Sequence, residues 1–338
     1  MSNNVQLSEP LVSVIIPTYN RPEYLKQAIA SAVKQTYQNI EIIVFDNCSL
    51  ENPQAIVESF QDPRIKFWRQ QQNIGMLANQ ISAFSMAQGK YLASLHDDDM
   101  WNDDFLAKLV PHLEANYGLV LAFCDHYIID KNSKINYVIT EENTQVYKRD
   151  KLAQGTYQNF YQIGLVDKSI PAAAACVIRN DFIDWNSIPL EVGGMWDLYL
   201  TYLCCISGRG AYYYPERLTC YRNHDQTDTM LSGNRDAQAK IRKAKSEMFC
   251  YQIFAEDLRL KKFRPYFKQK YLEAHTTLGI GLLRNKQIAA ARPYLWQALI
   301  QQKFNIRTLV ALTISFTPQL LANLFLGVPK YQENNLIS

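Results

Sequence analysis

Three consecutive carboxylates, Asp97, Asp98 and Asp99, stand directly after the apolar run Tyr91–Leu95. Short apolar runs are typical of buried strands, and ligands of open α/β sheets collect beyond the carboxyl ends of such strands. Adjacent acids repel one another, so they are tolerated best when water or a cation neutralises them. Hard cations such as Mg2+ take oxygen ligands and often bridge carboxylates to phosphates. The triplet is therefore either a metal and diphosphate site at a strand end or a solvated acidic loop before the helix near Phe105.

Two further carboxylates stand where a predicted element begins or ends. Asp46 follows the apolar run Ile40–Phe45, where it could accept hydrogen bonds from a nucleobase or ribose. Its structural alternatives are a helix N-cap or an Asx turn formed with Asn47. Asp197 stands at the start of a predicted helix, where it could act as a general base or simply cap the helix. Each of these acids thus has a chemical and a structural interpretation.

The elements that must position these residues alternate between strands and helices. Strands are expected over 11–17, 40–45, 65–68 and 120–129, with one more leading to Asp97, and helices over 22–34, 53–60, 77–87 and 105–116. This alternation predicts a parallel α/β sheet with right-handed crossovers. Further along, the composition predicts a polar loop or edge hairpin over 131–150, a strand over 171–179, a helix over 196–207, and short strands over 211–214 and 218–221.

The character of the chain changes near residue 238, where strand formers become rare and a helical period takes over. Residues 308–329 carry no charge, but Pro318 and several hydroxyl and amide side chains interrupt them. A membrane span needs about 20 mainly apolar residues. Two packed helices are the first expectation here, an interfacial amphipathic anchor the second, and a true span a distant third.

Bulk properties exclude several classes of protein. The chain has 338 residues, which is enough for one large or two ordinary domains, and its 48% hydrophobic content suits a packed core. A net charge of only +3 argues against nucleic acid as a partner. The seven cysteines are odd in number and form no CxxC pair, which favours reduced thiols in the cytoplasm. The polar stretch Met1–Pro10 lacks the apolar core of a secretory signal.

An ordered set of motifs over residues 11–230 resembles the family-2 glycosyltransferases, which have the GT-A nucleotide-sugar fold. The matching segments, in chain order, are Val14–Arg21, Ile42–Asn47, Asn73–Gly75 with Asn79, Gly89–Asp99, and Tyr221–His224 with Gln226. The resemblance implies an α/β GT-A catalytic domain over 11–230, followed by a C-terminal α-helical extension over 238–330. One departure is Ala78, because the family often carries an Arg just before the later Asn.

The resemblance also implies roles for individual residues. The expected nucleotide-sugar contacts are Pro17, Thr18, Tyr19, Arg21, Asp46, Asn73, Gly75, Asp97 and Asp98. The expected ligands of a divalent metal, Mn2+ or Mg2+, are Asp98, Asp99 and His224. Which of Asp98 and Asp99 binds the metal directly stays open, and an imidazole ligand would suit Mn2+ somewhat better.

The family usually takes its catalytic base from a Glu-Asp pair at a helix start, often followed by x-Asp-Leu. The corresponding segment here runs from Gly193 to Leu200 and aligns in two ways. Asp197 matches either the base itself or the second Asp, and in the latter case Met195 stands where the base should be. We expect Asp197 to be the base, because it is the only carboxylate at this helix start, with Glu191 in reserve.

The function implied by the resemblance is inverting, metal-dependent transfer of a sugar from a nucleoside-diphosphate donor, with a UDP-sugar expected. The acceptor would be a glycan or a lipid-linked sugar of cell-surface polysaccharide or glycolipid synthesis. The expected location is cytoplasmic, with a peripheral contact of the C-terminal helices to the inner membrane face as an option. A sugar-nucleotide pyrophosphorylase is disfavoured because residues 17–21 contain no glycine. A catalytically silent binding or scaffold protein of the same fold remains the alternative.

Overall fold

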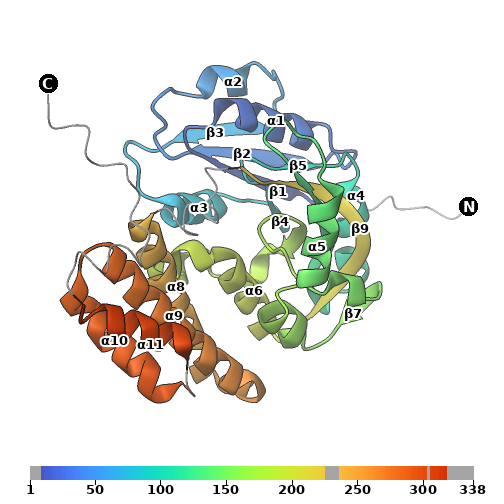
Figure 1. Ribbon diagram of the computed structural model, residues 1–338. Helices are drawn as coiled ribbons and strands as arrows, with labels where there is room; N and C mark the ends of the chain where they lie inside the picture. The colour runs from blue at the N-terminus through green and yellow to red at the C-terminus, as the bar shows by residue number, and fades with distance from the viewer. Residues whose placement is uncertain (1–8, 225–235, 303–304, 318–338) are drawn as a thin grey trace, which may run out of the picture. The chain divides into compact units, whose positions relative to one another are not determined.

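The computed structural model describes residues 9–224, 236–302 and 305–317, which form two compact units (Figure 1). The first unit comprises the described residues up to Leu190 together with Trp196–Asn223. The second comprises Glu191–Met195 and the described residues from His224 onward. Each unit is stabilised by a hydrophobic core of its own.

Within the described residues of the first unit, nine strands form one mixed sheet. They are β1 (Val12–Thr18), β2 (Ile40–Asp46), β3 (Ile65–Arg69), β4 (Tyr91–Ser94), β5 (Met100–Trp101), β6 (Leu119–Ile129), β7 (Gly155–Tyr157), β8 (Cys176–Arg179) and β9 (Gly210–Arg222). Their order is β3-β2-β1-β4-β8-β6-β9-β5, with β7 paired to β9. The first four strands in this order are parallel, whereas β8 is antiparallel to both of its neighbours. The expected parallel arrangement is therefore confirmed for the strands that carry the predicted site, and the remaining sheet is mixed.

Helices cover this sheet because its central strands are apolar on both faces. The helices are α1 (Pro22–Val33), α2 (Gln54–Glu58), α3 (Met76–Ser85), α4 (Phe105–Ala115), α5 (Tyr137–Val146) and α6 (Trp196–Ile206). All seven residues of β2 are buried. Apolar side chains of α1 and α4 share one core with those of β1 and β2, while α3 packs on the same two strands. Full burial of one Val, Leu or Ile contributes roughly 1.5–3 kcal/mol, so this layer fixes the strand ends beside the site.

Half of the polar stretch 131–150 is helix α5, where a loop or edge hairpin was predicted. Only the residues before the helix turn back as a hairpin would, with Ile135 in an antiparallel bridge to Ile129. Asn136 caps this helix by accepting a hydrogen bond from a backbone N–H of the first turn. The buried positions of α5 are Thr140 and Thr144, while its apolar side chains are exposed. In this helix polar side chains face inward and apolar side chains face solvent. The sequence pattern therefore did not predict a helix here.

Two strand predictions also need correction. The predicted strand over 171–179 shortens to β8, because Pro171 opens a turn that occupies the residues before Cys176. The two short strands predicted near residue 215 are one continuous strand, β9. Its register with β6 shifts between Cys124 and Asp125, and this irregularity accommodates Pro215 without ending the strand.

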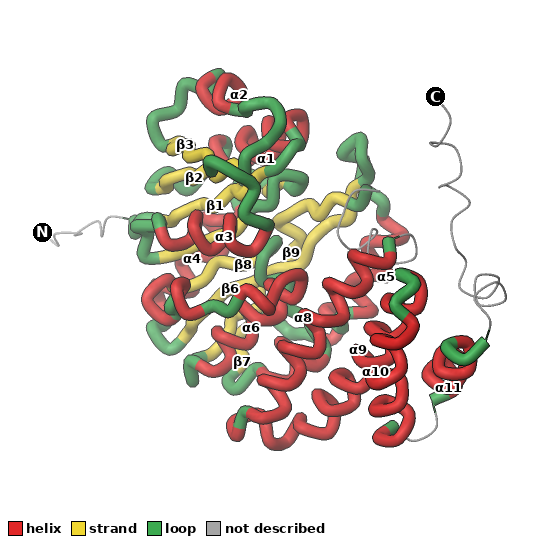
Figure 2. Tube along the Cα trace, turned by 90° about the vertical axis from the view of Figure 1, so that its left-hand side faces the viewer, coloured by secondary structure: helices red, strands yellow, loops and turns green. Residues whose placement is uncertain are grey.

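The second unit is helical, as the sequence predicts. Its helices are α8 (Ala237–Glu256), α9 (Arg264–Arg284), α10 (Ile288–Gln301) and α11 (Ile306–Ile314). Helix α9 packs on α8 and α10, and α11 lies beside α10 (Figures 1 and 2). Gly279 permits the α9–α10 contact, since a Cβ there would meet Leu295 at 2.5 Å. None of the described helices is both long and apolar enough to cross a bilayer. The uncharged stretch 308–329 begins in α11, and its part from 318 onward lies outside the described residues.

Candidate active site

The carboxyl ends of β2, β1 and β4 lie side by side and carry the residues in question. Thr18 is paired in register with Asp46, and Ile15 with Ser94 two residues before His96. Strand β1 has β2 on one side and β4 on the other, and the chain crosses over in opposite directions from it. Such a switch point is where open α/β sheets bind their ligands. The fold thus gathers the predicted residues of three separate segments at one edge.

Asp97 connects the loop after β4 to the loop after β1. Its Oδ2 accepts hydrogen bonds from the Thr18 hydroxyl at 2.8 Å and from the Tyr19 backbone N–H at 3.2 Å. Its Oδ1 accepts from the Arg21 Nη1 at 3.0 Å, and the same nitrogen donates to Asp98 Oδ2 at 2.8 Å. Five predicted site residues therefore meet in one hydrogen-bonded group.

A buried arginine holds the carboxylate loop from the other side. The Arg222 backbone N–H donates to Asp99 Oδ1 at 2.8 Å, and its Nε donates to the Asp98 carbonyl at 2.7 Å. The remaining guanidinium nitrogens bind Ser133 Oγ and Gln27 Oε1 at 2.9 and 2.8 Å. Arg222 is almost completely buried, so it is a positioning residue rather than a phosphate contact. The sequence singled out its motif without indicating this role.

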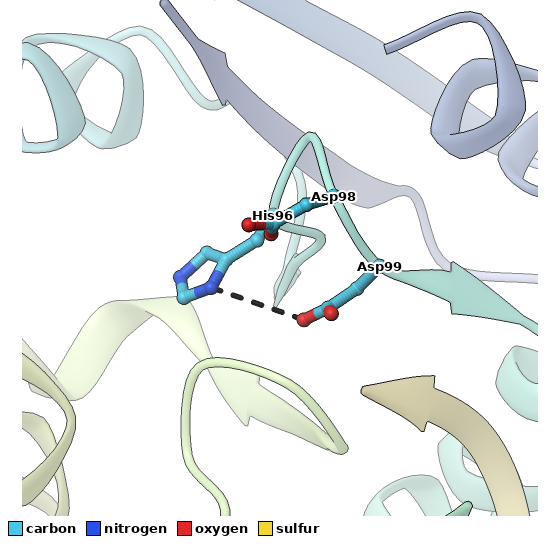
Figure 3. A group of neighbouring side chains, drawn as sticks. All are labelled: His96, Asp98 and Asp99. Atoms are coloured by element: carbon cyan, nitrogen blue, oxygen red, sulfur yellow. Dashed lines mark ion pairs between the residues drawn. The ribbon is translucent and has the colours of Figure 1, made fainter. Parts of the chain in front are cut away.

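Within the described residues, His96, Asp98 and Asp99 form a group that could hold a metal ion (Figure 3). One potential ligand atom from each lies within 4.8 Å of the others. His96 Nδ1 is 3.9 Å from Asp99 Oδ2, and Asp99 Oδ2 is buried without a hydrogen-bond partner. The sequence predicted Asp98 and Asp99 for this role but missed His96. The only sequence feature that could have identified His96 was its position directly before the three aspartates.

The pKa values in this group favour a bound cation. Burial, and next the neighbouring Asp98, raise the pKa of Asp99 to about 8. The same two causes raise the pKa of Asp97, while Arg21 and Thr18 lower it. A divalent cation would relieve the repulsion among these acids and satisfy the orphaned Asp99 oxygen. The donor set, two carboxylates and one imidazole, therefore fits Mn2+ or Mg2+.

Asp197 lies at the start of α6, near His96. Burial raises the pKa of Asp197, and His96 lowers it. In return, burial lowers the pKa of His96, but Asp197 and then Asp99 outweigh this effect and raise it. The Asp197 side chain remains open to solvent although protein surrounds it closely. The first unit thus holds a solvent-accessible carboxylate beside the metal-ligating group.

Asp46 is buried and already has protein partners. Its carboxylate accepts hydrogen bonds from the Ser49 backbone N–H and hydroxyl, and it pairs with Arg69 Nη1 at 3.2 Å. One predicted alternative, an Asx turn with Asn47, is replaced by a turn closed by Ser49. A base contact of Asp46 therefore stays a prediction and would require it to share these partners.

The segment Asn73–Gly75 is tied to the end of β2. The Asn47 side chain donates to Asn73 Oδ1 at 3.1 Å and accepts from the Ile74 backbone N–H at 2.9 Å. Gly75 has φ +88° and precedes α3, with open space where a side chain would be. Only glycine adopts this conformation without strain. The turn is therefore fixed by its backbone conformation and leaves room beside it.

Three predicted residues add less. Pro17, half-buried at the end of β1, has no side-chain polar group and can contribute only through its carbonyl and shape. His224 belongs to the second unit, and its role as a metal ligand stays a prediction. Gln226 lies outside the described residues. Glu191 and Met195, the alternatives at the base position, belong to the second unit.

The chain shares sequence with known glycosyltransferases. Residues 13–166 match the family described as Glycosyl transferase family 2. Over 134 residues the chain is 38% identical to an uncharacterized glycosyltransferase, MJ1057, of Methanocaldococcus jannaschii, covering 38% of this chain and 46% of that protein. Over 136 residues it is 29% identical to the UDP-Glc:alpha-D-GlcNAc-diphosphoundecaprenol beta-1,3-glucosyltransferase WfgD of Escherichia coli, covering 40% and 53%. The match thus spans about half the length of these curated relatives.

Solved structures confirm the predicted GT-A fold. The S. aureus protein TarS, residues 1–349 in complex with UDP-GlcNAc, superposes with a TM-score of 0.56 at 14% identity, covering 90% of each chain. The mannosyltransferase PcManGT from Pyrobaculum calidifontis, in complex with GDP-Man and Mn2+, gives a TM-score of 0.54 at 17% identity. That alignment covers 96% of this chain and 89% of the other.

Proposed function

We propose that the chain, whose residues 13–166 match glycosyl transferase family 2, is a metal-dependent, inverting glycosyltransferase. It transfers one sugar from a nucleoside-diphosphate donor to a glycan or lipid-linked acceptor. The observation that carries the proposal is the pairing of a metal-ligating group, His96, Asp98 and Asp99, with a nearby accessible carboxylate, Asp197. A transferase of this kind needs both: neutralisation of a leaving diphosphate and a base for the acceptor.

The metal would be held by His96, Asp98 and Asp99, with His224 as a further ligand predicted from sequence. When bound, it neutralises the charge that develops on the leaving diphosphate. The chain positions its ligands in advance, because Arg21 anchors Asp98 and Arg222 anchors Asp99. Preorganised ligands need little rearrangement during the reaction, which is the usual source of electrostatic catalysis.

Asp197 acts as the general base. Its carboxylate accepts the proton of the acceptor hydroxyl while that oxygen forms a bond to the anomeric carbon. The bond from the anomeric carbon to the diphosphate oxygen breaks on the opposite face, and the nucleoside diphosphate leaves with the electron pair. A single displacement of this kind inverts the anomeric configuration. The raised pKa of Asp197 supports the assignment, since a base works best when its pKa approaches the operating pH.

The donor nucleotide lies over the ends of β1 and β2. In this proposal Thr18, Tyr19 and Arg21, which all bond to Asp97, would face the phosphates and ribose. Asp46 and the Asn73–Gly75 turn would border the base. Two structural neighbours hold UDP-GlcNAc and GDP-Man, so the fold accepts either base. We favour a UDP-sugar, as WfgD is named for UDP-Glc, and a lipid-linked acceptor, as WfgD is named for a diphosphoundecaprenol substrate.

The cytoplasm is the proposed site of action. The seven cysteines are all described, none of them forms a disulfide, and five are buried. Free thiols of this number suit a reducing compartment.

The test is release of nucleoside diphosphate from a panel of UDP-, GDP- and dTDP-sugars, each with Mn2+ and with EDTA. We expect one donor to be hydrolysed or transferred in Mn2+ and none in EDTA. Isothermal titration in the same buffers measures donor binding separately. Donor binding without release, in the presence of a range of glycan and lipid-linked acceptors, would contradict the proposal and favour a silent binding protein.

A further inference from the structure

Helix α11 of the second unit carries apolar side chains on both its buried and its exposed face. Its inward face buries Thr308, Ala311 and Leu312. Its outward face exposes a stripe of large apolar side chains at helical spacing: Ile306, Leu309, Val310 and, just past the helix end, Phe316. Ile306 is 67% and Phe316 59% exposed. Large apolar side chains at helical spacing are normally covered, and this stripe has no cover among the described residues.

The neighbouring helix α10 extends the exposed apolar surface. Arg292 Nη2 donates a hydrogen bond to the Ser315 carbonyl at 2.8 Å, and its guanidinium stacks on the Phe316 ring at 4.4 Å. These contacts join α10 to the end of α11. One and two turns beyond Arg292, α10 exposes Trp296 and Ile300, the latter by 75%. We name the set Trp296, Ile300, Ile306, Leu309, Val310 and Phe316 the apolar face.

Cations gather beside the apolar face. Lys240 of α8, Arg284 of α9 and Arg307 of α11 lie close enough to interact, because burial and then Arg284 and Arg307 lower the pKa of Lys240. The buried Nε of Arg284 has no hydrogen-bond partner among the described residues. Arg307 lies on α11 between Ile306 and the inward-facing residues. Ile306 of the apolar face thus stands beside a group of cations whose charge Glu247 offsets only in part.

This local charge is part of a strong asymmetry along the chain. Residues 238–338 contain sixteen Lys and Arg but only five Asp and Glu. The residues before them contain nineteen Lys and Arg against twenty-seven Asp and Glu. The near-neutral total therefore conceals an acidic catalytic region and a basic helical region. A basic surface of this kind attracts anionic partners.

We infer that the apolar face and its flanking cations dock the second unit on an anionic lipid surface. Interfacial helices combine a stripe of Trp, Phe and Leu side chains with Lys and Arg, which bind lipid phosphates. A second copy of the chain is a poorer occupant, because a symmetric contact would bring the two cation clusters together. The chain's own residues 318–338 carry one Lys and one Glu, so they cannot neutralise the cluster. Charge complementarity thus favours anionic lipid.

The first test is co-sedimentation of the full chain with vesicles of phosphatidylcholine alone or with phosphatidylglycerol. We expect binding to the anionic vesicles, at least about tenfold weaker binding to the neutral ones, and loss of binding at high salt. The double variant Leu309→Ser, Val310→Ser should bind about tenfold more weakly, because it removes side chains that insert into the bilayer. The matched control is Val138→Ser, Val146→Ser, which alters two exposed valines of α5 and should bind normally.

The second test addresses the cations. Arg307→Gln should weaken binding to anionic vesicles about fivefold, whereas Lys34→Gln, which removes an exposed cation from α1's end, should not. Thermal melting and nucleoside-diphosphate release without vesicles verify that each variant is folded. Nucleoside-diphosphate release in solution measures the active site independently of vesicle binding. Failure of the docking inference and failure of the proposed function are therefore distinguishable.

Several outcomes would overturn the inference. One is a chain that stays in the supernatant with every vesicle at low salt. Another is an equal loss of binding in the α5 control. A change of oligomeric mass on Leu309→Ser, Val310→Ser, without a change in vesicle binding, would assign the apolar face to a second copy. Unchanged vesicle binding by that variant, combined with loss on deletion of residues 318–338, would move the lipid contact to that segment.

Discussion

At the residue scale, the account depends on two side chains that lie near each other, Asp197 and His96. The sequence predicted Asp197 by elimination, because it was the only acid at its helix start. It did not predict His96, because a lone histidine beside three acids has no distinctive spacing. Only the fold shows that His96 lies close to both Asp99 and Asp197.

The first prediction concerns the base. Asp197→Asn should lower turnover by at least about 100-fold, because general base catalysis contributes about 10²–10⁴-fold, while donor affinity stays nearly unchanged. Nucleoside-diphosphate release and calorimetric donor binding measure the two effects. Glu191→Gln is the matched control and should retain turnover. Full turnover in Asp197→Asn, or its loss in Glu191→Gln alone, would refute the assignment.

The second prediction separates the two candidate histidine ligands. His96→Gln should raise the Mn2+ concentration for half-maximal release roughly 10- to 100-fold, since loss of even an indirect ligand partner has effects of this size. His112→Gln, which alters a histidine stacked on Tyr212 away from the acids, should not. Metal titration of release measures both. If only His224→Gln shifts the titration, His96 is not a ligand.

At the element scale, the strands and helices that carry the site were predictable, and the elements that support it were less so. Strands β1 and β2 were recognised from their apolar runs, because every residue in them except Pro17 is buried. Helix α5 was missed, because its buried positions are threonines. Strand β9 was predicted as two strands, because a proline such as Pro215 usually ends a strand. Only the bulge in its pairing with β6 allows it to continue. Contacts with distant parts of the chain determine α5 and β9, and these contacts cannot be inferred from the local sequence.

The third prediction follows from the end of β9. Arg222→Met should lower the free energy of unfolding by about 3 kcal/mol, because it leaves the Asp98 carbonyl and other buried acceptors unsatisfied. It should also weaken metal binding, because the loop that carries Asp98 and Asp99 loses the side-chain contacts that hold it in place. Urea unfolding measures the first effect and metal titration the second. Arg242→Met, at an exposed position of α8, should change neither. If Arg222→Met were as stable as the wild type, Arg222 would not be the residue that holds the carboxylate loop in place.

At the scale of the whole molecule, the sequence predicted a GT-A unit followed by helices, and both were found. What it could not predict was the assignment of Glu191–Met195 to the second unit, because this short segment lies between elements of the first. The candidate site was predicted from motifs at the carboxyl ends of strands. Its positioning contacts were not, since they join residues more than 70 positions apart.

The fourth prediction concerns stability against pH. Burial, and next the neighbouring Arg149, lower the pKa of His126 to about 4 from an ordinary 6.5. Between these values the unfolded chain binds a proton that the folded chain does not. The contribution of neutral His126 to stability should therefore be complete above pH 6.5 and be lost as the pH drops toward 4. Urea unfolding at pH 7.5, 6 and 5 measures the decrease, which should be smaller in His126→Asn. An unchanged pH slope in that variant would contradict the assignment.

The central claim is metal-dependent glycosyl transfer at the His96, Asp98 and Asp99 group. Its most direct test is nucleoside-diphosphate release from the preferred donor by the wild type and by Asp99→Asn, in Mn2+ and in EDTA. The substitution keeps the shape of the side chain and its acceptor for the Arg222 backbone N–H, so it changes mainly the charge. We predict release by the wild type in Mn2+ and a loss of at least about 100-fold in EDTA or in the variant. Equal release in all four conditions would contradict the account.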